Sequence, residues 1–307
     1  MLTGHIAGVK FVFSVSNEAS VLHKLFIDEG ITHSAGVPTV WLAMFQHLDA
    51  LADSDRAADL GKMRVVTIGG SAAPRFMVER LMRMGIRLNH AWGMTETSPI
   101  GTMGSPAANW DDLTFDQQVE VTCKQGRVPF GVELRIIDKD GNVAPRDGLT
   151  SGRLEIRGPW VVKRYFKMDC DATADEQWFD TGDVAIIYPD GVMQITDRSK
   201  DVIKSGGEWI SSVELENAAV GCDGVAEAAA IGVHHPKWDE RPILLVVRKA
   251  GSAVTTSDVL AHLSDHVVKW WLPDEILFVD SLPHTGTGKI LKSELREQYR
   301  EYRLKAA

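Results

Sequence analysis

The stretch DGVMQITDRSKDVIKSGGEWISSVELE, residues 190–216, marks the point at which the pattern of the chain changes. On its N-terminal side, the pair Asp190-Gly191 is typical of a tight turn between two short strands. On its C-terminal side, Ser211 and Glu214 have the spacing of a capping box and predict the start of a helix. The segment DRSKD therefore indicates a domain boundary, which we place after Arg198.

Before this boundary the sequence predicts two kinds of structure. In the first third, apolar segments with helical spacing alternate with buried strands, which indicates a parallel or mixed sheet covered by helices. The predicted helices are EASVLHKLFIDEG (18–30), TVWLAMFQHLDALA (39–52) and RFMVERLMRM (75–84), and the predicted strands are ITHSAGV (31–37), MRVVTIGG (63–70) and IRLNHAWG (86–93). From about residue 126 to 196, short strands with Asp-Gly turns are predicted in VELRIIDKDGNVAP, GRLEIRGPWVVKRYF and DVAIIYPDGVMQITDR.

After the boundary the sequence predicts a small unit with its own core. Its predicted helices are SSVELENAAV, TTSDVLAHLSDHVV and KSELREQYREYRL, and its predicted strands are VAEAAAIGV, PILLVVRK and EILFVD. We therefore expect an α/β protein with two parts. Residues 1–198 form the first part and residues 199–307 form a small α+β domain.

Composition excludes several function classes. The chain is 44% hydrophobic and 24% charged, as in soluble globular proteins, and it contains no apolar run of membrane-spanning length and no signal-peptide pattern. Its three cysteines are far apart in the sequence, which argues against a zinc site and favours a reducing compartment. We therefore expect a cytoplasmic protein with no transmembrane segment. The net charge of −9 argues against nucleic acid as a partner.

A glycine-rich loop with a lysine, HTGTGKI (284–290), raises the question of a phosphate-binding P-loop. A P-loop needs a glycine five positions before the glycine that precedes the lysine, and a Ser or Thr after the lysine. Here Pro283 and Ile290 occupy those two positions. The stretch is not a P-loop, and Lys289 could equally be an ordinary solvated lysine.

Other segments combine glycines, hydroxyls and charges near predicted strand ends, where α/β proteins place their sites. In GGSAAP (69–74), the glycines permit close approach of a flat ligand, although an ordinary turn fits as well. In WGMTET (92–97), Thr95 could bind a phosphate oxygen and Glu96 could bind Mg²⁺, but a helix N-cap would use the same residues.

Two further segments lie on either side of the boundary. Asp183, in WFDTGDVA, could accept hydrogen bonds from two ribose hydroxyls, with Arg198 reaching the same sugar. An Asp–Arg pair on the surface, worth less than about 1 kcal/mol, is the alternative. In KSGGEWISSVELE (204–216), the double glycine permits a slim ligand to approach, whereas a plain loop before a helix explains it equally well.

Taken together and in this order, these segments resemble the adenylate-forming superfamily. The matching stretches are HSAGVPTVW, TIGGSAAP, WGMTETSP, QGRVPFGVELRI, RGPWVVKRYF, WFDTGDVA, DGVMQITDRSKDVIKSGGEWISSVELE and VVKWWLPDEILFVDSLPHTGTGKI. Within that superfamily the chain is most similar to fatty acyl-CoA ligases of the medium-chain type. The resemblance implies an acid–thiol ligase that uses ATP, Mg²⁺ and coenzyme A. A carboxylate would first form an acyl-adenylate with release of pyrophosphate, and the CoA thiol would then displace AMP.

The resemblance also implies roles for individual residues. Lys289 would bridge the carboxylate and the α-phosphate, Thr95 would bind phosphate, and Glu96 would bind Mg²⁺. The adenine and ribose would lie against Gly70, Ser71, Ala72, His90, Ala91, Trp92, Asp183 and Arg198. Lys200 occupies the family's hinge position, and the channel for the pantetheine arm of CoA would be lined by Gly206, Gly207 and Glu208. HTGTGKI would thus deliver one cation for the first half-reaction and withdraw it for the second.

The resemblance implies that part of the family's N-terminal domain is absent, because we find no Ser/Thr/Gly-rich phosphate loop ahead of HSAGVPTVW. Three possibilities stay open. The chain could be a fatty acid–CoA ligase, a ligase for an aryl or short-chain acid, or a non-catalytic fragment that binds AMP or CoA. A separate N-terminal chain or a homodimer is a further expectation. Val37, Trp41 and Trp92 suggest a pocket for an apolar tail.

Overall fold

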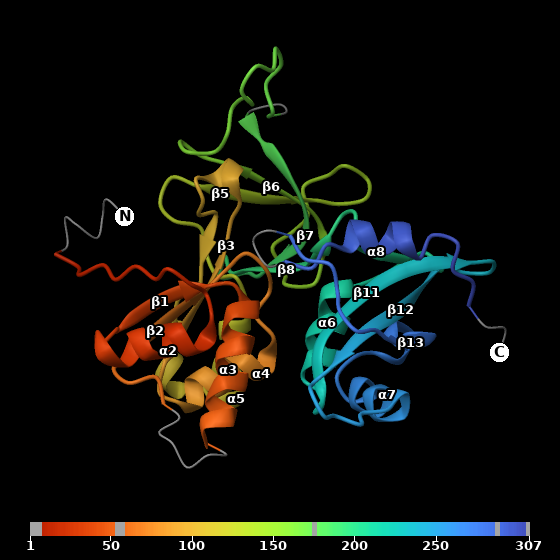
Figure 1. Cartoon of the computed structure of the whole chain (residues 1–307). Coiled ribbons are helices and arrows are strands. Elements are labelled where there is room, and N and C mark those ends of the chain that lie inside the picture. The colour runs from red at the N-terminus through yellow and green to blue at the C-terminus, as the bar shows by residue number, and fades with distance from the viewer. Residues whose placement is uncertain (1–7, 53–58, 174–176, 286–288, 305–307) are drawn as a thin grey trace.

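The computed structural model describes residues 8–52, 59–173, 177–285 and 289–304. Gly286, Thr287 and Gly288 of the HTGTGKI stretch therefore lie outside the described residues. Within these ranges the strands form three sheets, which occupy three separate regions of the molecule (Figure 1). The α/β class predicted from the sequence is confirmed.

The first sheet has the order β1-β2-β3-β4, and its first three strands are parallel. Parallel neighbours need a crossover, and α3 and α4 supply it. This region contains α2 (Ala19–Asp28), β1 (His33–Gly36), α3 (Pro38–Ala52), β2 (Val65–Ile68), α4 (Arg75–Arg83), β3 (Arg87–Trp92), η1 (Thr95–Thr97), β4 (Thr102–Met103), η2 (Trp110–Asp112) and α5 (Phe115–Cys123). Their shared core includes Trp41, Ile68 and Met77, each at most 2% exposed.

The second sheet is antiparallel, with the order β5-β6-β7-β8. Its strands are β5 (Glu133–Ile137), β6 (Gly152–Arg157), β7 (Phe179–Ile187) and β8 (Met193–Arg198). Asp190-Gly191 forms the turn between β7 and β8, as predicted. The strand predicted through RGPWVVKRYF ends at Arg157, so residues 160–166 are wrong as strand. Pro159 cannot donate to a strand ladder, which favours this early end.

The third sheet has the order β10-β9-β12-β11, and β13 pairs in parallel with β12. Its elements are β9 (Ile203–Ser205), β10 (Glu208–Ile210), α6 (Ser212–Val220), β11 (Val225–His235), β12 (Asp239–Arg248), α7 (Thr256–Ser264), η4 (Lys269–Trp271), β13 (Glu275–Phe278) and α8 (Lys292–Gln298). One face packs on α6 and α7 and the other on α8, each with its own apolar core. The predicted boundary after Arg198 falls between β8 and β9 and stays a prediction.

Candidate functional site

The turn after β2 brings the backbone of Gly70 against a lysine side chain. Gly70 has φ +89°, a left-handed conformation that glycine adopts without strain. A Cβ added at this position would lie 3.1 Å from Val37 Cγ1 and 3.3 Å from Lys289 Cε. The structure thus places the predicted Gly70 and Lys289, which are far apart in the sequence, side by side.

Lys289 is hydrogen-bonded to Thr285. The Thr285 amide donates to the Lys289 carbonyl at 2.8 Å, and the Lys289 amide donates to Thr285 Oγ1 at 3.2 Å. Burial lowers the pKa of the Lys289 amine; the Arg198 guanidinium lowers it further, and the Asp183 carboxylate raises it. Lys289, Arg198 and Asp183 therefore form one interacting group of charges.

Asp183 and Arg198 are direct partners in the ladder between β7 and β8. Arg198 Nε lies 3.6 Å from Asp183 Oδ1, and Trp92 Nε1 donates a 2.8 Å hydrogen bond to Asp183 Oδ2. Burial raises the pKa of Asp183, whereas the Trp92 hydrogen bond and Arg198 oppose that rise. The structure therefore brings together the predicted residues Trp92, Asp183, Arg198 and Lys289.

Thr95 and Glu96 lie in the single turn η1 that follows β3. Thr95 is exposed, and the side chain of Thr97 fixes the turn by accepting a 2.9 Å hydrogen bond from the Met94 amide. Tyr165 donates a 2.9 Å hydrogen bond to Glu96 Oε1. Sequence reasoning missed Tyr165 as a site residue, because nothing in the spacing of RGPWVVKRYF relates it to a carboxylate almost seventy positions earlier.

His90 is hydrogen-bonded to the backbone next to the glycine turn. The ring is 1% exposed; Nδ1 donates to the Cys123 carbonyl at 2.9 Å, so Nε2 accepts from the Ala73 amide at 3.3 Å. Burial lowers the pKa of His90 to about 4, and the ring is neutral at pH 7. His90 thus holds the turn that contains Ser71 and Ala72, while Ala91 and Trp92 continue the strand toward Asp183.

The remaining predicted residues lie farther along the chain. Lys200 is exposed in the turn after β8. Gly206 and Gly207 form the turn between β9 and β10, with φ +60° and +87°, and Glu208 opens β10. A Cβ on Gly206 would lie 3.0 Å from the Trp238 ring. No contact that the structure describes joins this turn to Lys289.

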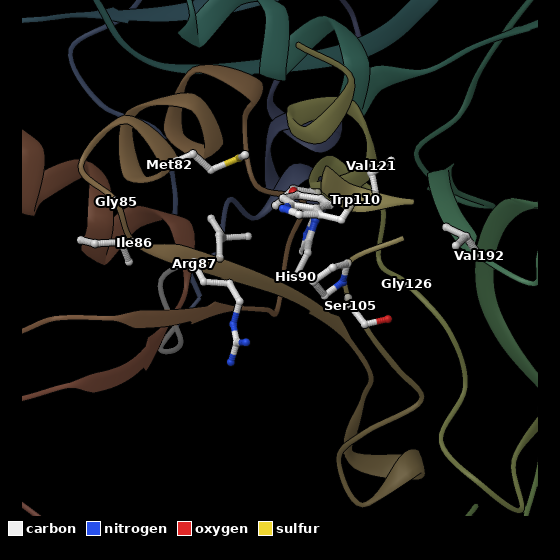
Figure 2. A pocket seen from close by; sticks show the side chains of 14 residues that line it. Met82, Gly85, Ile86, Arg87, His90, Ser105, Trp110, Val121, Gly126 and Val192 are labelled. Atoms are coloured by element: carbon white, nitrogen blue, oxygen red, sulfur yellow. The ribbon is translucent and has the colours of Figure 1, made fainter. Parts of the chain in front are cut away.

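Two pockets lie in the first region of the molecule. A pocket of about 280 Å³ borders β3 and α5, with Trp110 next to His90 and Arg87 pointing away from both (Figure 2). Its lining residues are Met82, Gly85, Ile86, Arg87, Leu88, His90, Gly104, Ser105, Pro106, Trp110, Val121, Thr122, Gly126 and Val192. A second, of about 240 Å³, contains the predicted Trp41 but neither Val37 nor Trp92. Neither pocket is lined by Gly70, Asp183 or Lys289.

Among the described residues, no helix is long and apolar enough to cross a membrane. No three His, Cys, Asp or Glu side chains within those ranges gather as a group that could hold a metal ion.

Comparison with known proteins gives this arrangement a family. The sequence profile of the AMP-binding enzymes matches residues 1–166. The chain belongs to the AMP-binding enzyme family. The profile of the C-terminal domain of AMP-binding enzymes matches residues 214–289, which include Lys289. The resemblance inferred from the motifs is thereby confirmed.

Relatives of this AMP-binding enzyme have known activities. A medium-chain-fatty-acid–CoA ligase of Ectopseudomonas oleovorans is 43% identical over 94% of the chain and 52% of the relative. A 3-methylmercaptopropionyl-CoA ligase of Ruegeria pomeroyi is 47% identical over 88% of the chain and 50% of the relative. The crystal structure of ATP-bound MatB from Rhodopseudomonas palustris matches with a TM-score of 0.80 and 27% identity, over 98% of the chain and 57% of MatB. The chain spans about half the length of the curated relatives it matches.

Proposed function

We propose that this chain carries the nucleotide- and CoA-handling part of an ATP-dependent fatty acid–CoA ligase, with a medium-chain acid as substrate. The observation that carries the proposal is the group formed by Gly70, Trp92, Asp183, Arg198 and Lys289. It combines a backbone surface without side chains, an aromatic ring, a buried carboxylate and two cations. These are the groups that a nucleoside monophosphate needs for its base, its ribose and its phosphate.

Charge development explains the role proposed for Lys289. When a carboxylate attacks the α-phosphate of ATP, negative charge gathers on the phosphoryl oxygens in the transition state. A cation aimed at that position lowers the barrier more than it tightens substrate binding. The ordinary pKa of a lysine amine is far above 7; burial and the Arg198 guanidinium lower the pKa of Lys289, and the Asp183 carboxylate raises it.

The other residues receive roles that match their chemistry. Asp183 would accept hydrogen bonds from the ribose hydroxyls, and Thr95 would donate to a phosphate oxygen. Glu96, oriented by Tyr165, would hold Mg²⁺, which neutralises phosphate charge when it is bound. The turn at Gly206 and Gly207 would admit the pantetheine arm of CoA; Glu208 follows this turn directly, and Lys200, the proposed hinge, lies six positions before Gly206.

A ligase for a shorter acid is a second candidate. The 3-methylmercaptopropionyl-CoA ligase of Ruegeria pomeroyi is the more identical of the two relatives, at 47% against 43%. Because the acyl tail is the part of the substrate that the nucleotide site does not contact, the group around Lys289 fits both readings equally. Acid length therefore has to be measured.

The decisive experiment is acyl-CoA formation by the purified chain with ATP, Mg²⁺, CoA and acids of graded length. We expect a product whose rate peaks at medium-chain acids. Lys289→Ala should slow acyl-adenylate formation by roughly 10²–10³-fold, as removal of one transition-state donor does. It should spare thioester formation from supplied acyl-adenylate. Lys249→Met, which removes an exposed lysine, is the control and should be as active as the unaltered chain.

Other outcomes separate the alternatives. A rate that peaks at short or aryl acids would contradict the medium-chain substrate and favour the other acids. Binding of AMP or CoA without turnover would favour a non-catalytic fragment, or a chain that needs a separate N-terminal partner or a second copy. Equal loss in both half-reactions on Lys289→Ala would contradict the role given to that lysine. We also propose that the protein works in the cytoplasm, a reducing compartment, because its three cysteines form no disulfide.

A further inference from the structure

A buried ionic cluster lies close to the candidate site but outside it. Lys292 Nζ lies 2.8 Å from Glu216 Oε1 and donates a 2.7 Å hydrogen bond to Ser212 Oγ. The side chains of Lys292 and Glu216 are only 10% and 14% exposed. Asp197, 1% exposed, accepts a 2.6 Å hydrogen bond from the Ser212 amide and a further one from Ser212 Oγ.

The cluster joins segments that are distant in the sequence. Asp197 is at the end of β8, Ser212 and Glu216 are in the first turns of α6, and Lys292 opens α8. Burial lowers the pKa of the Lys292 amine, but Glu216 and Asp197 raise it by more, so the amine stays charged. Removing one member would leave the opposite charge buried without its counter-ion, which is strongly unfavourable.

Two members of the cluster, Asp197 and Lys292, are close in the chain to residues of the group of charges around Lys289. Asp197 precedes Arg198, whose guanidinium contacts Asp183. At the other end, Lys292 follows Lys289 by three residues in a tightly bonded segment. The Leu291 amide donates to the Pro283 carbonyl at 2.8 Å, and His284 pairs with Ile290 as an antiparallel bridge. The cluster thus fixes the end of the Lys289 segment relative to the strand that carries Arg198.

We propose that Lys292 is a positioning residue, which holds the Lys289 amine against Gly70 and Asp183 through its buried contacts with Glu216 and Ser212. It touches neither substrate nor nucleotide. Its effect on catalysis rests on the proposed function, whereas its effect on the position of Lys289 does not. The two can therefore be tested separately.

The first test measures the position of Lys289 without any reaction. The protein is treated briefly with an acetylating reagent, and mass spectrometry gives the rate at which the Lys289 amine is modified, relative to exposed Lys24. In the unaltered chain we expect slow labelling, because Lys289 is half-buried. In Lys292→Met we expect labelling several-fold faster, and in Lys292→Arg a return toward the slow rate. Lys249→Met is the matched control and should not change it.

Unchanged Lys289 labelling in a folded Lys292→Met variant would overturn the proposal. If that variant fails to fold, Lys292→Met combined with Glu216→Gln removes both charges of the 2.8 Å pair, while Asp197 keeps its hydrogen bonds from Ser212. The same fast labelling is expected from this pair, and slow labelling would equally overturn the proposal.

The second test is a double-mutant cycle in acyl-adenylate formation. Lys292→Met should slow this step, yet add little to the loss already caused by Lys289→Ala, because both changes act through the same amine. Additive losses would show that Lys292 does not act through Lys289. If the unaltered chain forms no acyl-adenylate, the proposed function fails, and the labelling test alone decides the role of Lys292.

Discussion

At the scale of single residues, the hydrogen bond from Trp92 to Asp183 is the most informative contact of the site. Asp183 is 9% exposed, so its carboxylate has lost most of its hydration. The Trp92 N–H and the Arg198 guanidinium take the place of part of that lost hydration. The Trp92 N–H therefore opposes the rise in the pKa of the Asp183 carboxyl that burial causes.

Trp92→Phe keeps a ring and removes this donor. This change should weaken AMP binding by less than the roughly 1.5–3 kcal/mol that a hydrogen bond to a charged group contributes, because the lost bond lies within the protein and acts on the ligand only through Asp183. Without the donor the pKa of Asp183, already raised by burial, should rise further. Because protonation removes an acceptor for the ribose, the fall in AMP affinity on acidification should begin at a higher pH in the variant. Isothermal titration calorimetry across acid to neutral pH measures this, and an unchanged pH profile would contradict it.

At the scale of elements, Arg241 on β12 ties the third sheet together. Its guanidinium donates to Asp274 Oδ1 at 2.8 Å and to the Trp270 and Leu272 carbonyls at 2.9 and 3.0 Å. It also lies 3.3 Å from Ser205 Oγ, next to the turn at Gly206. The side chain is 8% exposed, so these partners replace its water. Arg241 thereby fixes β9 and the segment around η4 on the same strand.

Arg241→Met should destabilise the third sheet by about 3–5 kcal/mol, because Asp274 and two carbonyls lose their donor. Arg300→Met, at a side chain that is 72% exposed, is the control and should cost less than about 1 kcal/mol. Urea unfolding followed by circular dichroism measures both. A cost for Arg241→Met no larger than the control's would show that the buried guanidinium does not hold these segments.

Local signals in the sequence predicted most elements, and they failed where tertiary contacts decide. Ser211 caps α6 as predicted, by accepting from the Glu214 amide at 3.1 Å. The helix α5 was not predicted, although Thr114 and Gln117 form a capping box there. The hairpin β9–β10 was read as a loop, because its strands are three residues each and pair only around Gly206 and Gly207. The predicted helix after Lys292 ends at Gln298.

The site itself was predictable only as a set of separate motifs. Asp183 and Arg198 could be related through the β7–β8 hairpin, whose turn is visible in the sequence. The approach of Lys289 to Gly70 could not, because it depends on how the third sheet packs. Tyr165 and the Lys292 cluster were missed for the same reason: their partners lie 69 and 76–80 positions away.

At the scale of the whole molecule, the apolar side chains of the described residues are packed into four clusters that belong to three sheets. Each sheet therefore has a core of its own. The ion pairs near the boundary contribute less to the free energy of unfolding than these apolar cores do. Unfolding should then proceed in more than one step, since cooperativity requires a shared core. Differential scanning calorimetry should resolve at least two transitions, of which Arg241→Met lowers only one. A single transition that shifts as a whole would contradict this view.

The buried ring of His90 limits the conditions under which the site can be studied. Its pKa of about 4 lies below the value of about 6.5 expected in an unfolded chain. Stability from the neutral ring is thus complete above about pH 6.5 and is lost as the pH falls toward 4, by about 3 kcal/mol in total. In the folded protein the ring becomes protonated only below about pH 4, and its Nε2 can then no longer accept from the Ala73 amide next to the turn at Gly70. Ligand complexes are therefore best sought from neutral or alkaline crystallisation conditions.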